Sequence, residues 1–155
     1  MKKIMFVCHG NICRSPMAEF IMKKLIAEKN LQNEFFIVSS ATSTEEIWNG
    51  KGNPVYPPAK RMLSKHGISC EGKTAIQLKE SDCDKYDMFI GMDSMNIRNM
   101  KRILGSRGEN KIYKLMTFAG SEDDVSDPWY SGDFNKAYED IYKGCKGLIE
   151  FIVEK

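Results

Sequence analysis

The ten residues Val7–Pro16, which read VCHGNICRSP, decide both the fold and the place where chemistry can occur. The apolar run Ile4–Val7 that leads into them is typical of a buried strand. After them an apolar stripe recurs at helical spacing to about Lys29, and Ser15-Pro16 is a typical N-cap followed by a first helical residue. The stretch is therefore predicted to be a loop that joins the end of a strand to the beginning of a helix.

The rest of the chain alternates apolar runs with helical patterns. Further strands are predicted at Phe35–Val38, Met88–Met92 and Ile112–Leu115. Further helices are predicted from about Ala59 up to a C-terminal Gly67, from an Asp93 cap, and from an Asp133 cap to the end of the chain. Such alternation indicates an α/β fold, in which helices cover both faces of a parallel sheet. In folds of this class, ligands bind beyond the carboxyl ends of the strands.

The composition fits one globular domain over residues 1–155, with 42% hydrophobic and 28% charged residues. A formal charge of +2 is too balanced for a protein that neutralises a nucleic-acid backbone, so no nucleic-acid partner is expected. No apolar run approaches the roughly 20 residues that span a bilayer, so no membrane span is expected. An odd number of cysteines, five, and an opening too polar for a signal peptide favour a reducing, cytoplasmic location.

Metal-ligand clusters are missing from the sequence pattern. The chain has two histidines, His9 and His66, and no Cys-x-x-Cys pair. Zinc sites in proteins use closely spaced cysteines and histidines. We therefore expect neither a metal nor another cofactor.

The loop Val7–Pro16 has the residues for binding and attacking a tetrahedral dianion. Its backbone N–H groups and the following helix N-terminus form an anion nest, to which Asn11 contributes by tolerating left-handed backbone. The planar fork of Arg14 can hold two oxygens of that anion, and the same N–H groups favour a thiolate at Cys8. A thiolate beneath a phosphate is a nucleophile for phosphoryl transfer. The predicted phosphate-binding residues are His9, Gly10, Asn11, Ile12, Cys13 and Arg14.

Together with other motifs, this loop resembles the phosphate-binding loop of low-molecular-weight protein tyrosine phosphatases. The further motifs are Ser39, Lys65-His66-Gly67, Gly91-Met92-Asp93 and Asp127-Pro128-Trp129-Tyr130, and the resemblance covers nearly the full chain. It implies a single phosphotyrosine protein phosphatase I-like domain with a four-stranded parallel sheet in the order 2-1-3-4. The implied substrates are phosphotyrosine proteins or peptides and small aryl phosphates, with phosphate-like oxyanions as inhibitors.

The resemblance also assigns roles to the catalytic residues. Cys8 attacks phosphorus, and Asp127 first protonates the leaving phenol and then takes a proton from the water that hydrolyses the cysteinyl phosphate. Arg14 binds the phosphate, and the hydroxyl of Ser15 donates to the sulfur. Cys13 is implied as the partner of Cys8 in a reversible disulfide formed after oxidation by peroxide.

Supporting roles follow from the same resemblance. Asn11 is implied to brace the loop through hydrogen bonds, with Ser39 and His66 as its partners. A slot for the substrate ring is expected from Trp48, Trp129 and Tyr130. Trp129 departs from the Asp-Pro-Tyr-Tyr that is commoner in eukaryotic members of the family, which affects the expected substrate preference.

Other functions fit the sequence less well. An arginine phosphatase has a threonine at the position of Ile12, and an arsenate reductase has two redox cysteines close together in a late loop, unlike Cys70 and Cys83. A phosphocarrier domain needs no acid, so the Asp127-Pro128 motif and Arg14 argue against it. A non-catalytic phosphotyrosine-binding module has no use for a thiolate at Cys8. The phosphatase interpretation uses the thiolate, the arginine and the acid.

Overall fold

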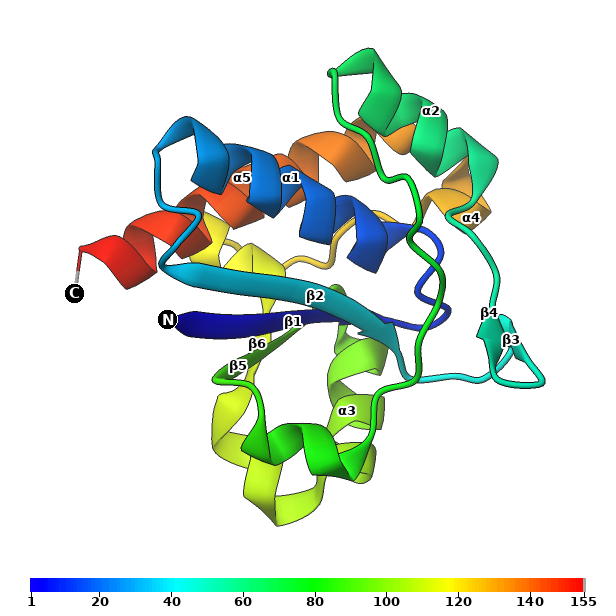
Figure 1. Cartoon of the computed structure of the whole chain (residues 1–155), viewed down its shortest axis with the longest axis vertical. Coiled ribbons are helices and arrows are strands. Elements are labelled where there is room, and N and C mark those ends of the chain that lie inside the picture. The colour runs from blue at the N-terminus through cyan, green and yellow to red at the C-terminus, as the bar shows by residue number, and fades with distance from the viewer. Residues whose placement is uncertain (155) are drawn as a thin grey trace.

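The centre of the molecule is a parallel sheet (Figure 1). A computed structural model describes residues 1–154. The four strands of the sheet lie in the order β2-β1-β5-β6, which confirms the predicted order 2-1-3-4. Their bounds are Lys2–Cys8 for β1, Phe35–Ala41 for β2, Met88–Gly91 for β5 and Ile112–Lys114 for β6.

Helices cover both faces of this sheet. Figure 1 shows α1, α2 and α5 on one face and α3 on the other. Their bounds are Arg14–Glu28 for α1, Pro57–Lys65 for α2, Ser94–Gly108 for α3, Pro128–Ser131 for the short α4 and Phe134–Val153 for α5. Three 3-10 segments lie at Glu80–Asp84, Glu109–Lys111 and Leu115–Ala119. No helix within residues 1–154 has the length and apolar character needed to cross a bilayer.

The continuous apolar run in β1 has a simple explanation. Successive side chains of a strand point to opposite faces, and both faces of this sheet are covered. Ile4 and Phe6 pack into the core beneath α1 and α5, whereas Met5 and Val7 pack into the core on the α3 side. Cys8 belongs to the α1 side, at the carboxyl end of the central strand.

Most predicted helix ends are confirmed. Asp93 accepts a hydrogen bond from the backbone N–H of Asn96 at 2.7 Å, and Asp133 accepts one from Lys136 at 2.9 Å. Gly67, with φ +72°, follows α2 in the left-handed conformation that ends many helices. The N-cap of α1, however, is Cys13, so the prediction of Ser15 as N-cap was wrong.

A small hairpin, the short helix α4 and the 3-10 segments were not predicted from the sequence, and the hairpin matters most for the site. The hairpin, β3 (Ile47–Trp48) and β4 (Lys51–Gly52), lies beside the carboxyl end of the sheet (Figure 1). Its turn is Asn49-Gly50, and both residues have positive φ, 51° and 76°. An Asn-Gly pair is a strong signal for a two-residue hairpin turn. This hairpin changes which residues reach the pocket described below.

The packing of α5 onto the segment Leu115–Ala119 leads to a first prediction. A Cβ atom at Gly147 would overlap the carbonyl oxygen of Phe118, which is backbone and cannot move aside. We expect Gly147→Ala to lower stability by about 2 kcal/mol and the melting temperature by about 5 °C, although alanine is the better helix former. Thermal denaturation checks this, with the exposed Lys146→Ala as the matched control; equal melting temperatures in both variants would contradict it.

Candidate active site

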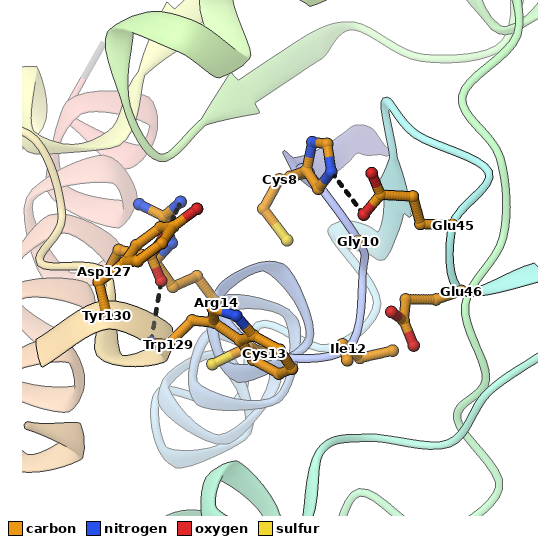
Figure 2. Close-up of a pocket in the computed structure, with 11 residues that line it drawn as sticks. Cys8, Gly10, Ile12, Cys13, Arg14, Glu45, Glu46, Asp127, Trp129 and Tyr130 are labelled. Atoms are coloured by element: carbon orange, nitrogen blue, oxygen red, sulfur yellow. Dashed lines mark hydrogen bonds and ion pairs between the residues drawn. The ribbon is translucent and has the colours of Figure 1, made fainter. Parts of the chain in front are cut away.

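The loop between β1 and α1 forms the floor of a cavity of about 190 Å³ (Figure 2). Asn11 in this loop has φ +57°, the left-handed conformation expected of an anion nest. The residues that line the cavity are Cys8, His9, Gly10, Ile12, Cys13, Arg14, Glu45, Glu46, Asp127, Trp129 and Tyr130. Three distant parts of the chain therefore meet at the carboxyl edge of the sheet.

The sulfur of Cys8 contacts Ser15 in the first turn of α1. Cys8 is only 4% exposed, its Sγ lies 3.0 Å from the hydroxyl of Ser15, and the backbone N–H of Ser15 donates to it at 3.4 Å. The positive end of the helix dipole adds to these contacts. Hydrogen-bond donors and a helix N-terminus are the surroundings that stabilise sulfur anions in proteins.

The side chain of Asn11 holds the loop from behind. Its amide nitrogen donates to the hydroxyl of Ser15 at 2.8 Å and to the hydroxyl of Ser39 at 2.9 Å. Its amide oxygen accepts from the backbone N–H of Ile76 at 3.0 Å. The structure thus brings together Asn11, Ser15 and Ser39, three of the four residues expected to support the loop.

The fourth, His66, lies elsewhere, and the prediction that it braces the loop was wrong. His66 follows the last residue of α2, and its ring stacks on Tyr138 of α5, with ring centroids 3.8 Å apart and planes 7° from parallel. All hydrogen-bonding groups of the Asn11 amide are already used by other residues. Lys73, from the segment after α2, lies behind the loop instead and donates to the carbonyl oxygen of Ser39 at 2.9 Å.

Arg14 is the buried cation of the cavity. It is 4% exposed, and its guanidinium donates to Asp93 at 2.7 Å, to Asp127 at 3.4 Å and to the carbonyl oxygen of Val125 at 3.0 Å. Burial opposes its charge, but the nearby Cys8 sulfur and the Asp93 carboxylate together raise the pKa of Arg14. A fork oriented in this way presents a fixed positive charge to an anion above the loop.

Asp93 was predicted only as a helix cap, and its contact with Arg14 was missed. One carboxylate oxygen caps α3 while the other accepts from Arg14. A signal was available, because Asp93 follows strand β5, and the carboxyl ends of neighbouring parallel strands meet at one edge of the sheet.

Asp127 lies at the opening of the cavity. One of its carboxylate oxygens accepts from the backbone N–H of Trp129 at 3.1 Å and caps α4, while the other faces Arg14. Its side chain is 32% exposed, so it contacts both the cavity and water. A carboxyl group in that position can exchange protons with a molecule bound over Cys8.

The two sides of the cavity differ in chemistry. Figure 2 shows Asp127, Trp129 and Tyr130 on one side of the loop and Glu45 and Glu46 on the other. The ring of Trp129 is itself supported by Tyr56, at a centroid distance of 4.9 Å. We call Trp129 and Tyr130 the aromatic wall, and Glu45 and Glu46 the acidic wall.

The acidic wall was not predicted from the sequence. Glu45 lies 3.0 Å from the ring nitrogen Nε2 of His9, and Glu46 accepts from the side chain of Asn53 at 2.9 Å. A Cβ at Gly10 would lie 3.2 Å from Cγ of Glu46, so Glu46 packs closely over the loop.

Trp48 does not line the cavity, and its assignment to the ring slot was wrong. It is 79% exposed and lies in strand β3 of the small hairpin. The tight turn at Asn49-Gly50 pairs Trp48 with Lys51 across the hairpin. Glu45 and Glu46, which precede the hairpin, line the cavity instead.

Cys13 lines the same cavity but differs from Cys8. Burial, reinforced by negative charge on Cys8, raises the pKa of the Cys13 thiol, so this residue stays protonated. All five cysteines are free, and Cys70, Cys83 and Cys145 are buried away from the cavity. Among residues 1–154, no three His, Cys, Asp or Glu side chains are grouped so as to hold a metal ion.

Comparisons with known proteins agree with this geometry. A family model described as low molecular weight phosphotyrosine protein phosphatase matches residues 3–155. The chain is 37% identical over 155 residues to the low molecular weight protein-tyrosine-phosphatase PtpA of Staphylococcus saprophyticus, which covers 99% of this chain and 96% of that protein.

Solved structures show the same fold. The crystal structure of YfkJ from Bacillus subtilis matches with a TM-score of 0.92 at 35% identity, covering 99% of this chain and 96% of that one. DARP, a drosophila arginine phosphatase, matches with a TM-score of 0.85 at 25% identity, covering 98% of each chain. The resemblance found in the sequence is confirmed, and the chain belongs to the low molecular weight phosphotyrosine protein phosphatase family.

Proposed function

We propose that this protein hydrolyses phosphotyrosine in proteins and peptides, and small aryl phosphates, through a cysteinyl-phosphate intermediate. The observation that carries the proposal is the convergence of Cys8, Arg14 and Asp127 on one small cavity. A nucleophile, a fixed cation and an exposed carboxyl group are the three components that hydrolysis of a phosphate ester without a metal requires.

In the first step the phosphate dianion binds in the nest His9–Arg14, and the sulfur of Cys8 attacks phosphorus opposite the phenolic oxygen. Arg14 holds two equatorial oxygens, and this stabilises the charge spread over them in the transition state. Tyrosine is a poor leaving group, because its phenol has a pKa near 10. Asp127 therefore donates a proton to the phenolic oxygen as the P–O bond breaks.

In the second step the cysteinyl phosphate is hydrolysed. Asp127, now a carboxylate, takes a proton from a water that attacks phosphorus, and the sulfur leaves as an anion. The hydroxyl of Ser15, 3.0 Å from the sulfur, stabilises that anion as leaving group and as nucleophile. Phosphate then departs, and phosphate-like oxyanions are expected to inhibit by occupying the same nest.

The aromatic wall supports an aryl substrate. Trp129 is 55% exposed and Tyr130 is 87% exposed, which leaves ring faces free to pack against a phenyl group entering the cavity. On the floor Ile12 offers an apolar surface without a hydroxyl that could bond a guanidino phosphate. Both features favour phosphotyrosine over phosphoarginine.

The first test compares phosphate release from a phosphotyrosine peptide and a phosphoarginine peptide at pH 5–7. We expect selective release from phosphotyrosine, no release by Cys8→Ser, and no effect of a chelator, because no step uses a metal. Preference for phosphoarginine would contradict the role given to Ile12. Stable labelling of Cys8 without turnover would instead indicate a phosphate carrier.

A second test isolates the proton donor. Asp127→Asn is expected to lower kcat for phosphotyrosine by about 10²- to 10⁴-fold, because the phenolic oxygen would leave without a proton. The loss should be smaller for a nitrophenyl phosphate, whose leaving group is more acidic. Asp123→Asn, an exposed acid of the same loop, serves as control. An equal loss for both substrates would rule out the proposed proton transfer.

A third test uses the acidic wall. Glu45 and Glu46 should attract a lysine or arginine next to the phosphotyrosine, with an effect of about threefold in kcat/KM for each partly exposed carboxylate. We expect the variant Glu45→Gln/Glu46→Gln to lose the preference for such peptides over neutral ones while keeping its activity on a small aryl phosphate. An unchanged peptide preference, measured at low salt, would show that these carboxylates do not select the substrate.

We further propose that Cys13 protects the nucleophile. Peroxide would oxidise the thiolate of Cys8 to a sulfenic acid, and the thiol of Cys13 would displace water from it to form a disulfide that thiols can reduce. Both residues line the same cavity, which supports this pairing. A reducing compartment, which we propose to be the cytoplasm, would return both cysteines to the free state.

A further inference from the structure

A buried carboxylate lies behind the phosphate loop and takes no part in the mechanism above. Glu19 of α1 is 5% exposed, and the hydroxyl of Ser39 donates to its Oε1 at 2.6 Å. Two lysines face it: Lys23 of α1 donates to Oε2 at 2.6 Å, and Nζ of Lys73 lies 3.6 Å from Oε1. A buried charge is costly unless it is paired and hydrogen-bonded, and these contacts compensate the charge of the Glu19 carboxylate.

An ionised Glu19 decides the direction of a row of buried hydrogen bonds. A carboxylate can only accept, so the hydroxyl of Ser39 must give its single proton to Glu19. The oxygen of Ser39 is then free to accept from the amide of Asn11. That interaction, together with the backbone N–H of Ile76 that donates to the amide oxygen, fixes which end of the Asn11 amide faces the two serines. The second N–H of the amide is directed at Ser15.

The row ends on the nucleophile. Because the oxygen of Ser15 already accepts from Asn11, its own proton must go to an acceptor. The sulfur of Cys8 lies 3.0 Å away, whereas the alternative acceptor, the carbonyl oxygen of Ser40, lies 3.4 Å away. The charge on Glu19 is thereby linked to the proton that stabilises the sulfur anion.

We propose that Glu19 and Lys73 are positioning residues for Cys8: the carboxylate, which can only accept, sets the direction of the hydrogen bonds Ser39–Asn11–Ser15–Cys8, and Lys73 pairs with its charge. The inference rests on the proposed function only in taking Cys8 as the nucleophile. It gives a role to Glu19 and Lys73, which sequence patterns alone do not single out. In the sequence, Glu19 and Lys23 resemble an ordinary pair of charges on a helix surface.

Lys73 is the more important of the two lysines in this respect. Its side chain is only 10% exposed, compared with 46% for Lys23, so its charge is less screened by water. Burial lowers the pKa of Lys73, and the carboxylate of Glu19 limits that decrease. Its ammonium also donates to the carbonyl oxygen of Ser39, which holds it beside the strand.

The experiment measures the alkylation of Cys8 by iodoacetamide between pH 4 and 9, with the modified residue identified by peptide mapping, in wild type, Glu19→Gln and Glu19→Gln/Lys73→Met. A glutamine can donate as well as accept, so Ser39 is no longer forced to donate and the Ser15 proton is no longer committed to the sulfur. We expect the pH of half-maximal alkylation to rise by about one unit in both variants, and kcat/KM for a small aryl phosphate at pH 6 to fall about tenfold.

The double variant separates positioning from folding. Glu19→Gln alone leaves Lys73 buried without its partner and should lower the melting temperature, whereas removing both charges should largely restore it. The inference holds if the shift in alkylation persists in the stable double variant, and if the exposed Glu28→Gln of the same helix behaves like wild type.

Two results would overturn the inference. The first is a pH of half-maximal alkylation in Glu19→Gln that equals the wild-type value. The second is a double variant in which both the pH of half-maximal alkylation and the melting temperature return to their wild-type values. Alkylation does not depend on turnover, so the two proposals fail separately. A shifted alkylation profile in a protein that hydrolyses no phosphotyrosine would refute the proposed function and support the positioning role.

Discussion

The contacts between Ser15 and the sulfur of Cys8 are the interaction around which the molecule is arranged. In the proposed mechanism this sulfur, almost fully buried at the end of the central strand, reacts as an anion, and a buried anion is unfavourable unless donors surround it. The donors come from the first turn of α1, which must therefore begin directly above the strand. That requirement explains the short loop and the left-handed Asn11 within it.

Charges around the cavity are balanced in two layers. In front of the loop, Arg14 lies between Asp93 and Asp127, so its guanidinium is already oriented toward the cavity. Behind the loop, Glu19 and Lys73 form a second pair in the protein interior. In the proposed mechanism Arg14 and Asp127 act on the substrate directly. In the proposed positioning role Glu19 and Lys73 act through the hydrogen-bonded side chains of the loop. Preorganised charges of this kind need little rearrangement during the reaction.

The fold was largely predictable because its signals are local. Apolar runs and helical stripes located the four strands of the main sheet and the helices α1, α2, α3 and α5 that cover it, and the alternation of strands and helices implied their parallel pairing. The hairpin at Ile47–Gly52 was missed, since its strands are two residues long and show no periodicity. The error over Trp48 follows from that omission, because Trp48 belongs to the hairpin and is not among the residues that line the cavity.

By itself the sequence determined the strand, loop and helix that present Cys8 and Arg14, because these residues are neighbours along the chain and local backbone geometry fixes their relation. The tertiary structure alone decided which distant residues complete the site. It replaced His66 by Lys73 behind the loop, added Asp93 beside Arg14, and placed Glu45 and Glu46, not Trp48, in the lining of the cavity. Such contacts depend on how helices and hairpins pack in three dimensions, and no local pattern records that packing.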